Sequence, residues 1–185
     1  MIRQICILML LFIALSCEDN AMLPKPKAQL SLQYARPDYI DISTPCSYQF
    51  KKNTRANFEL LNDCESKLVY PKMRATVYLS YRSIENNLDS LLADAYQMPS
   101  KHIIKASEIP EKVFINPDNR AYGTLFRVVG EAASQVQFFL TDSTNHFLVG
   151  SLYFYTRPNY DSIMPAARYI EQDMVKLMES LSWKE

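Results

Sequence analysis

The sequence has little of what usually marks an enzyme. Only 3 glycines occur in 185 residues, and a glycine-rich phosphate-binding loop is absent, as are a G-x-S-x-G nucleophile elbow and an H-E-x-x-H zinc helix. Lysine plus arginine equals aspartate plus glutamate at 20 each, which argues against a nucleic-acid-binding surface. Composition therefore favours a protein that binds partners over one that catalyses, with no cofactor and no nucleic-acid partner.

Long apolar runs are also scarce. The one such run, residues 5–15, follows Arg3 and stops just before Cys17. It is too short for a membrane-spanning helix, which needs about 20 apolar residues, but it has the form of a signal peptide. Residues 14–17 read Ala-Leu-Ser-Cys and fit the pattern cleaved by the lipoprotein signal peptidase. We expect a lipoprotein signal peptide at residues 1–16 and a lipid on Cys17; the alternative is a plain secretory signal.

The stretch after the cysteine has the composition of a linker. Proline and lysine alternate over residues 24–27, which predicts an extended, lipidated linker at 17–29 and a single secreted α+β domain at 30–185. Two or three acyl chains would hold the protein on a membrane, so we expect an envelope protein with a periplasmic domain, on the outer membrane in preference to the inner. Glu18 and Asp19 are either a signal for surface export or solvated linker residues.

The four cysteines divide by position. Cys6 would leave with the signal peptide and Cys17 would carry lipid, which leaves Cys46 and Cys64 to form a disulfide in an oxidising compartment. Closing that loop would stabilise the fold by about 3 kcal/mol in the chain-entropy model. The alternative is a free thiol at Cys64. The histidines and cysteines lack the close spacing of a zinc site, so no metal is expected.

Several segments alternate between apolar and polar residues with the period of a β-strand. These predicted strands are 73–81, 122–129, 135–141 and 147–155, with shorter ones near 29–34 and 48–50. Turn-forming residues fill positions 142–145, which predicts a hairpin between the third and fourth segments.

Two further segments have the apolar period of helices. The first extends from Ile84 to Ala95 and should end near Pro99. The second starts near Asp161 or Ser162 and continues to Leu181. Its predicted polar face comprises Arg168, Glu171, Gln172, Asp173, Lys176 and Glu179. The pattern predicts an α+β fold, a mainly antiparallel sheet with two principal helices packed on one face.

One group of residues could form a hydrolase site. Ser143 or Ser151 would be the nucleophile, with His146 as base and Asp142 as orienting acid. Neighbours on a tight turn usually point into solvent, so we instead expect local turn hydrogen bonds and a histidine at the edge of a strand. His102, near a helix end, fits a local polar contact. We predict no catalytic residues.

The chain is rich in aromatic residues, with 12 Tyr and 9 Phe. Such rings serve in cores, in protein interfaces or in sugar stacking. The strand positions of Phe138, Phe154 and Tyr153 predict burial. The amino-terminal third holds four tyrosines for which core and interface remain equally open, namely Tyr34, Tyr39, Tyr48 and Tyr70.

Motifs spread over the chain point to one family. The most specific is Gln137–Ser143, followed by His146–Leu148 and Gly150–Phe154. Other matching stretches are 24–27, Cys46 with Tyr48 and Phe50, 77–81, 86–88, His102 with 104–106, 123–125, 158–159, 161–162, 179–181 and Trp183. From Cys17 onward the chain resembles the gliding motility lipoprotein GldD family of the Bacteroidetes, although residues 30–46 depart most from its pattern.

The resemblance implies an envelope lipoprotein needed for gliding and for type IX protein secretion. Its implied partners are the membrane, through the lipid, and other gliding and type IX secretion lipoproteins and translocon components. Only lipid attachment at Cys17 carries over as a site. The leading hypothesis is a non-enzymatic accessory scaffold; the alternatives are a glycan- or peptidoglycan-binding domain and an envelope hydrolase built around His146.

Overall fold

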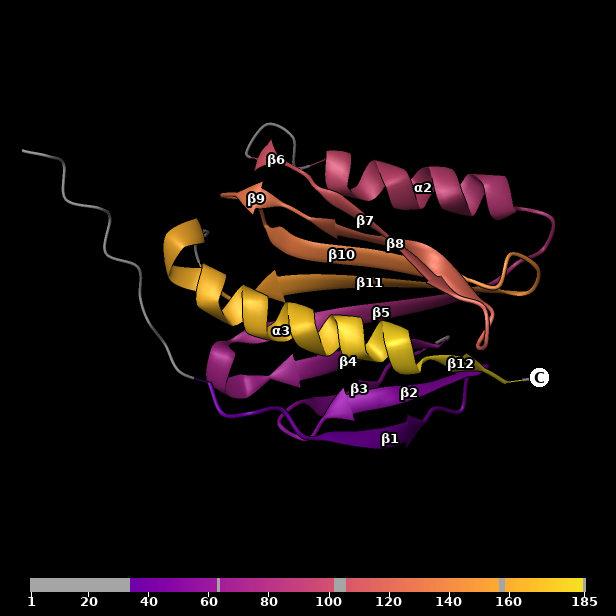
Figure 1. Ribbon diagram of the computed structural model, residues 1–185, viewed down its shortest axis with the longest axis horizontal. Helices are drawn as coiled ribbons and strands as arrows, with labels where there is room; N and C mark the ends of the chain where they lie inside the picture. Colours follow the sequence, from indigo (N-terminus) through magenta and orange to yellow (C-terminus); the bar gives the residue numbers. More distant parts are fainter. Residues whose placement is uncertain (1–33, 63, 102–105, 157–158, 185) are drawn as a thin grey trace, which may run out of the picture.

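A seven-stranded antiparallel sheet forms the centre of the protein. The computed structural model describes residues 34–62, 64–101, 106–156 and 159–184. The strands follow the order β3-β4-β5-β11-β10-β8-β7 (Figure 1). Their bounds are β3 (Asn57–Leu60), β4 (Glu65–Tyr70), β5 (Ala75–Ser83), β7 (Glu111–Asn116), β8 (Ala121–Arg127), β10 (Ser134–Thr141) and β11 (His146–Phe154). The prediction of a mainly antiparallel sheet is confirmed.

Two smaller sheets and two α-helices complete the described residues. One sheet has the order β1-β2-β12, and the other pairs β6 with β9. The bounds are β1 (Tyr39–Ser43), β2 (Tyr48–Asn53), β6 (Ala106–Glu108), β9 (Val129–Gly130), β12 (Ser182–Trp183), the 3-10 helix η1 (Pro71–Met73), α2 (Leu88–Ser100) and α3 (Tyr160–Ser180). The predicted strand at 29–34 lies mostly outside the described residues. No described helix is long and apolar enough to cross a membrane.

The hairpin of β10 and β11 is the best buried part of the sheet. All eight residues of β10 are buried, and Thr141 pairs with Phe147 across the predicted turn. Phe138 lies opposite Gly150, and a Cβ atom at position 150 would lie 2.1 Å from the Phe138 ring. Only glycine leaves room for that ring, so the hairpin positions one of the largest core side chains.

The two helices cover opposite faces of the sheet. Phe138 belongs to the same core cluster as Ile170 and Met174 of α3, whereas Phe139 belongs to a second cluster with Ala95 of α2. Successive residues of a strand point to opposite faces. In Figure 1, α3 crosses in front of the sheet and α2 follows its upper border. The α+β class is confirmed, but the predicted packing of both helices on one face is wrong, because β10 is buried on both sides.

Helix α3 is buried over a wider arc than its sequence suggests. It packs against β10 of the large sheet and also against β2 of the small one. The predicted polar face is therefore wrong at Glu171 and Asp173, which are 8% and 4% exposed. Glu171 forms an ion pair with Arg127, whose Nε atom donates to Oε2 at 3.0 Å. Glu171 is thus buried beside a cation from the large sheet, and Asp173 is buried where the small sheet covers α3.

Candidate functional site

The proposed lipid attachment site, Cys17, lies outside the described residues, as does His102. Cys46 and Cys64, the pair singled out by the sequence, are joined by a disulfide with Cα atoms 5.8 Å apart. Cys46 lies just before β2 and Cys64 just before β4. The disulfide therefore fastens the small sheet to the large one.

Asp142 stabilises the turn of the β10–β11 hairpin. Its Oδ1 atom accepts the backbone N–H groups of Thr144, Asn145 and His146 at 2.8–3.0 Å. Burial by itself would raise the pKa of Asp142, but these hydrogen bonds outweigh burial and lower it to about 2. Since the folded-state pKa lies below the ordinary value, the stabilisation is present above about pH 4 and is lost as the pH falls toward the folded value. The carboxylate of Asp142 therefore stabilises the turn through its hydrogen bonds.

The structure does not bring the residues of the hydrolase hypothesis together. The Nδ1 atom of His146 lies 2.7 Å from the Tyr81 hydroxyl, and its ring stacks on Trp183 with centroids 5.1 Å apart. Ser151 lies five positions further along the same strand, about 17 Å away and on the other face. Ser143 is exposed and makes no hydrogen bond to His146 within the described ranges. No triad is assembled in this conformation.

A buried carboxylate joins α3 to three strands of the fold. Asp173 accepts hydrogen bonds from the Tyr39 hydroxyl at 2.8 Å, from Asn53 Nδ2 at 2.9 Å and from the Tyr70 hydroxyl at 3.1 Å. Burial raises the pKa of Asp173, and the three donors offset that only in part. Burial likewise raises the pKa of Tyr70 and Tyr39 far above the ordinary value. These hydrogen bonds link α3 to strands β1, β2 and β4 in the interior of the protein.

The structure answers part of the question left open for the four amino-terminal tyrosines. Tyr48 and Tyr70 are buried core residues, and Tyr39 is half-buried and bonded to Asp173. Tyr34 packs its ring 5.0 Å from Tyr169 and lines a pocket of about 500 Å³. Arg55 and Lys72 also line this pocket. Two of the four tyrosines, Tyr48 and Tyr70, therefore belong to the core. Tyr34 lies at the edge of a pocket that includes two cationic side chains.

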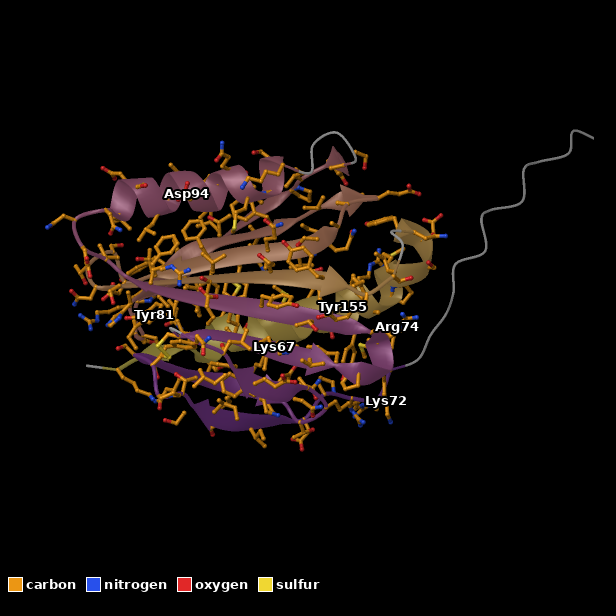
Figure 2. All side chains as sticks on the ribbon, turned by 180° about the vertical axis from the view of Figure 1, so that it is seen from behind. Lys67, Lys72, Arg74, Tyr81, Asp94 and Tyr155 are labelled. Atoms are coloured by element: carbon orange, nitrogen blue, oxygen red, sulfur yellow. A yellow bond between two sulfur atoms is a disulfide. The ribbon has the colours of Figure 1, made fainter. Side chains whose placement is uncertain are left out.

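A cluster of exposed tyrosines lies on the face of the sheet opposite α3. We define the tyrosine patch as Tyr78, Tyr153 and Tyr155, which are 38%, 37% and 53% exposed. The hydroxyls of Tyr78 and Tyr155 lie 2.9 Å apart, and the rings of Tyr78 and Tyr153 meet edge to face at 5.9 Å. Figure 2 looks onto this face and shows Tyr155 near Lys67 of β4. The patch offers ring faces and hydroxyls to a ligand.

The tyrosine patch corrects one sequence-based prediction. Tyr153 was expected in the core because of its strand position, but it lies opposite Thr76 in β5, on the same sheet face as Tyr78. Helix α2 covers that face only near Phe126, Phe139 and Phe147. The period-two spacing of Tyr153 and Tyr155 is the signal that could have identified an exposed aromatic row.

Comparison with known proteins supplies the family. The family model described as gliding motility lipoprotein GldD matches residues 19–183. No curated protein and no solved structure gives a match. The family match spans the disulfide, the hairpin and both described helices, so it covers the whole of the fold outlined above. The chain therefore belongs to the GldD family of gliding motility lipoproteins.

Proposed function

We propose that this chain is a lipid-anchored, non-enzymatic accessory scaffold required for gliding motility and for type IX protein secretion. The observation that carries the proposal is the match of residues 19–183 to a family of gliding motility lipoproteins. The separation of Ser151 from His146, and the use of Asp142 as a turn residue, support a role in binding.

In this proposal Cys17 carries the lipid, residues 17–29 form the tether and residues 30–185 form one secreted domain. Confinement to a membrane surface raises the effective concentration of weak partners without any new contact. The expected partners are other gliding and type IX secretion lipoproteins and translocon components. We propose a periplasmic domain with its anchor in the outer membrane, where the folded domain presents its surface to these partners.

The lipid anchor is tested by Cys17→Ala in the full-length chain. We expect loss of metabolic labelling with a fatty acid, a larger precursor that keeps its signal peptide, and type IX secretion and colony spreading reduced to the level of a deletion strain. Ser16→Ala is the matched control, because it keeps a small residue before the cysteine and should leave all three readouts unchanged. Normal secretion by Cys17→Ala at equal protein level would contradict the tethered scaffold.

The tyrosine patch favours a second candidate function, the binding of a glycan strand such as peptidoglycan. Its three rings lie on a sheet surface, as sugar stacking requires. If wild-type protein cosediments with purified sacculi, the double variant Tyr153→Ala/Tyr155→Ala should bind at least about fivefold more weakly, since each lost ring contact is worth about 0.5–1.5 kcal/mol. Tyr153→Phe/Tyr155→Phe keeps both rings and should retain binding. Wild-type protein that fails to sediment would eliminate this candidate.

A further inference from the structure

Strand β7 ends the large sheet with an exposed apolar edge. Among the strands that the structure describes, it pairs only with β8. Val113 and Ile115 are 69% and 67% exposed, more than any other large apolar side chain within the described ranges. An edge strand of this kind can pair with a further strand. Natural proteins usually prevent such pairing with charged residues, bulges or a covering element.

The backbone of β7 points half of its hydrogen-bonding groups away from the sheet. The Arg127 N–H donates to the carbonyl of Pro110 at 3.0 Å, so residue 110 faces β8. Alternate residues of a strand face the same neighbour, and the ladder pairs Lys112 with Leu125 in the same register. It follows that the N–H and C=O groups of Glu111, Val113 and Ile115 point outward.

Free backbone groups and exposed side chains coincide on the same residues. Phe114 packs against the main core on one face of the sheet, so Val113 and Ile115 project from the other. Pro110 and Pro117 flank the strand, and neither can donate a backbone hydrogen bond. The accessible edge is therefore a short one centred on Val113.

We propose that two copies of this chain pair through β7, antiparallel, about a twofold axis at Val113. In this register Val113 lies opposite Val113 of the second copy, and Glu111 lies opposite Ile115. Each outward N–H of one strand then meets an outward C=O of the other. No like charges face each other, since Lys112 lies opposite Phe114. The strand is thus self-complementary, and the two large sheets become one continuous sheet.

The expected dimer is weak in solution. A single pair of short strands buries much less than the roughly 1,600 Å² of a standard interface, and each backbone hydrogen bond contributes only about 0.5–1.5 kcal/mol net. Paired copies are therefore best trapped covalently in the envelope, where the full-length chain resides. The pairing does not depend on the proposed scaffold role, since it follows from the edge geometry alone.

Cysteine crosslinking of the full-length chain in cells tests both pairing and register. Residues opposite each other at hydrogen-bonded positions have Cα atoms about 5.5 Å apart, within the range that a disulfide spans. Val113→Cys should crosslink to itself under mild oxidation. Glu111→Cys and Ile115→Cys should each stay monomeric alone and crosslink when expressed together. Tyr155→Cys is exposed and distant from the edge, so it serves as the control that should not crosslink.

Val113→Pro supplies an independent test. The Val113 N–H points away from β8, so proline removes an outward donor and no bond of the existing ladder. In this background the Glu111→Cys and Ile115→Cys pair should lose its crosslink while the melting temperature stays near wild type. If Val113→Pro fails to fold, Val113→Lys replaces it, because a lysine on the edge blocks pairing. No crosslink at position 113, self-crosslinking of Glu111→Cys, or capture of another protein would each overturn the proposal.

Discussion

Replacing Asp173 with alanine should lower the free energy of unfolding by about 3 kcal/mol, because each buried donor left without an acceptor costs about 1–3 kcal/mol. The carboxylate is 4% exposed and receives hydrogen bonds from Tyr39, Asn53 and Tyr70. Removing the charge recovers part of the cost of burying it, which keeps the expected loss below the sum of three lost bonds. Urea unfolding of the purified protein measures the change.

Two further variants, one at position 173 and one at the adjacent residue, serve as controls for Asp173→Ala. Asp173→Asn keeps one acceptor oxygen but sets an amide donor against three other donors, so its loss should lie between those of wild type and alanine. Gln172→Ala changes the adjacent, exposed residue of α3 and should stay within about 0.5 kcal/mol of wild type. Equal stability of Asp173→Ala and Gln172→Ala would show that the hydrogen-bonded cluster contributes nothing to the fold.

Removing the disulfide should cost about as much. The double variant Cys46→Ala/Cys64→Ala is expected to lose about 3 kcal/mol, the chain-entropy value for a loop of this size. The bond spans a sequence separation of 18 residues and fastens β2 to β4. Alanine is preferred to serine because Cys46 is buried and a hydroxyl there would need a partner. Thermal unfolding with and without a thiol reductant gives the measurement.

The disulfide experiment compares the melting temperatures of wild-type protein and of the double variant, each with and without reductant. Reductant should lower the melting temperature of wild-type protein toward that of the double variant and leave the double variant unchanged. A wild-type protein that is insensitive to reductant after full reduction of the disulfide has been verified would contradict the expected contribution. Cys46→Ala alone would leave Cys64 free to react, which is why both residues are replaced together.

Local pattern predicted four of the seven strands of the large sheet and both α-helices. Period-two alternation predicted the strands β5, β8, β10 and β11. The turn-forming residues at 142–145 predicted the hairpin that joins β10 to β11. The same reasoning missed the placement of α2, because β10 is buried on both faces and a strand's sequence does not say which face receives which helix. Only the pairing of distant segments decides that.

The errors on α3 have the same origin. Glu171 and Asp173 look like solvent-facing residues when the helix is considered against one sheet. They are buried because β8 supplies Arg127 to the first and the small sheet covers the second. Tyr153 is the opposite case, a strand aromatic left exposed where α2 does not reach. In each instance an element far away in sequence determines the environment of the side chain.

The candidate hydrolase residues show the limit of proximity in sequence. Asp142, Ser143 and His146 are close along the chain, yet the carboxylate is used by the turn and the imidazole contacts Tyr81 and Trp183. The sequence correctly predicted local turn hydrogen bonds for Asp142. No pattern in the sequence predicted that His146 stacks on Trp183 of β12, which lies 37 positions further along the chain.

The last strand also sets the order in which the fold is completed. Ser182 and Trp183 pair with Gln49 and Tyr48, so β2, the middle strand of the small sheet, gains its second neighbour from a strand more than 120 positions later in the sequence. Synthesis from the amino terminus leaves β2 with β1 as its one neighbour in this sheet until Ser182 and Trp183 are available. Completion of the small sheet is therefore a late step of folding, and one edge of β2 stays unpaired until that step.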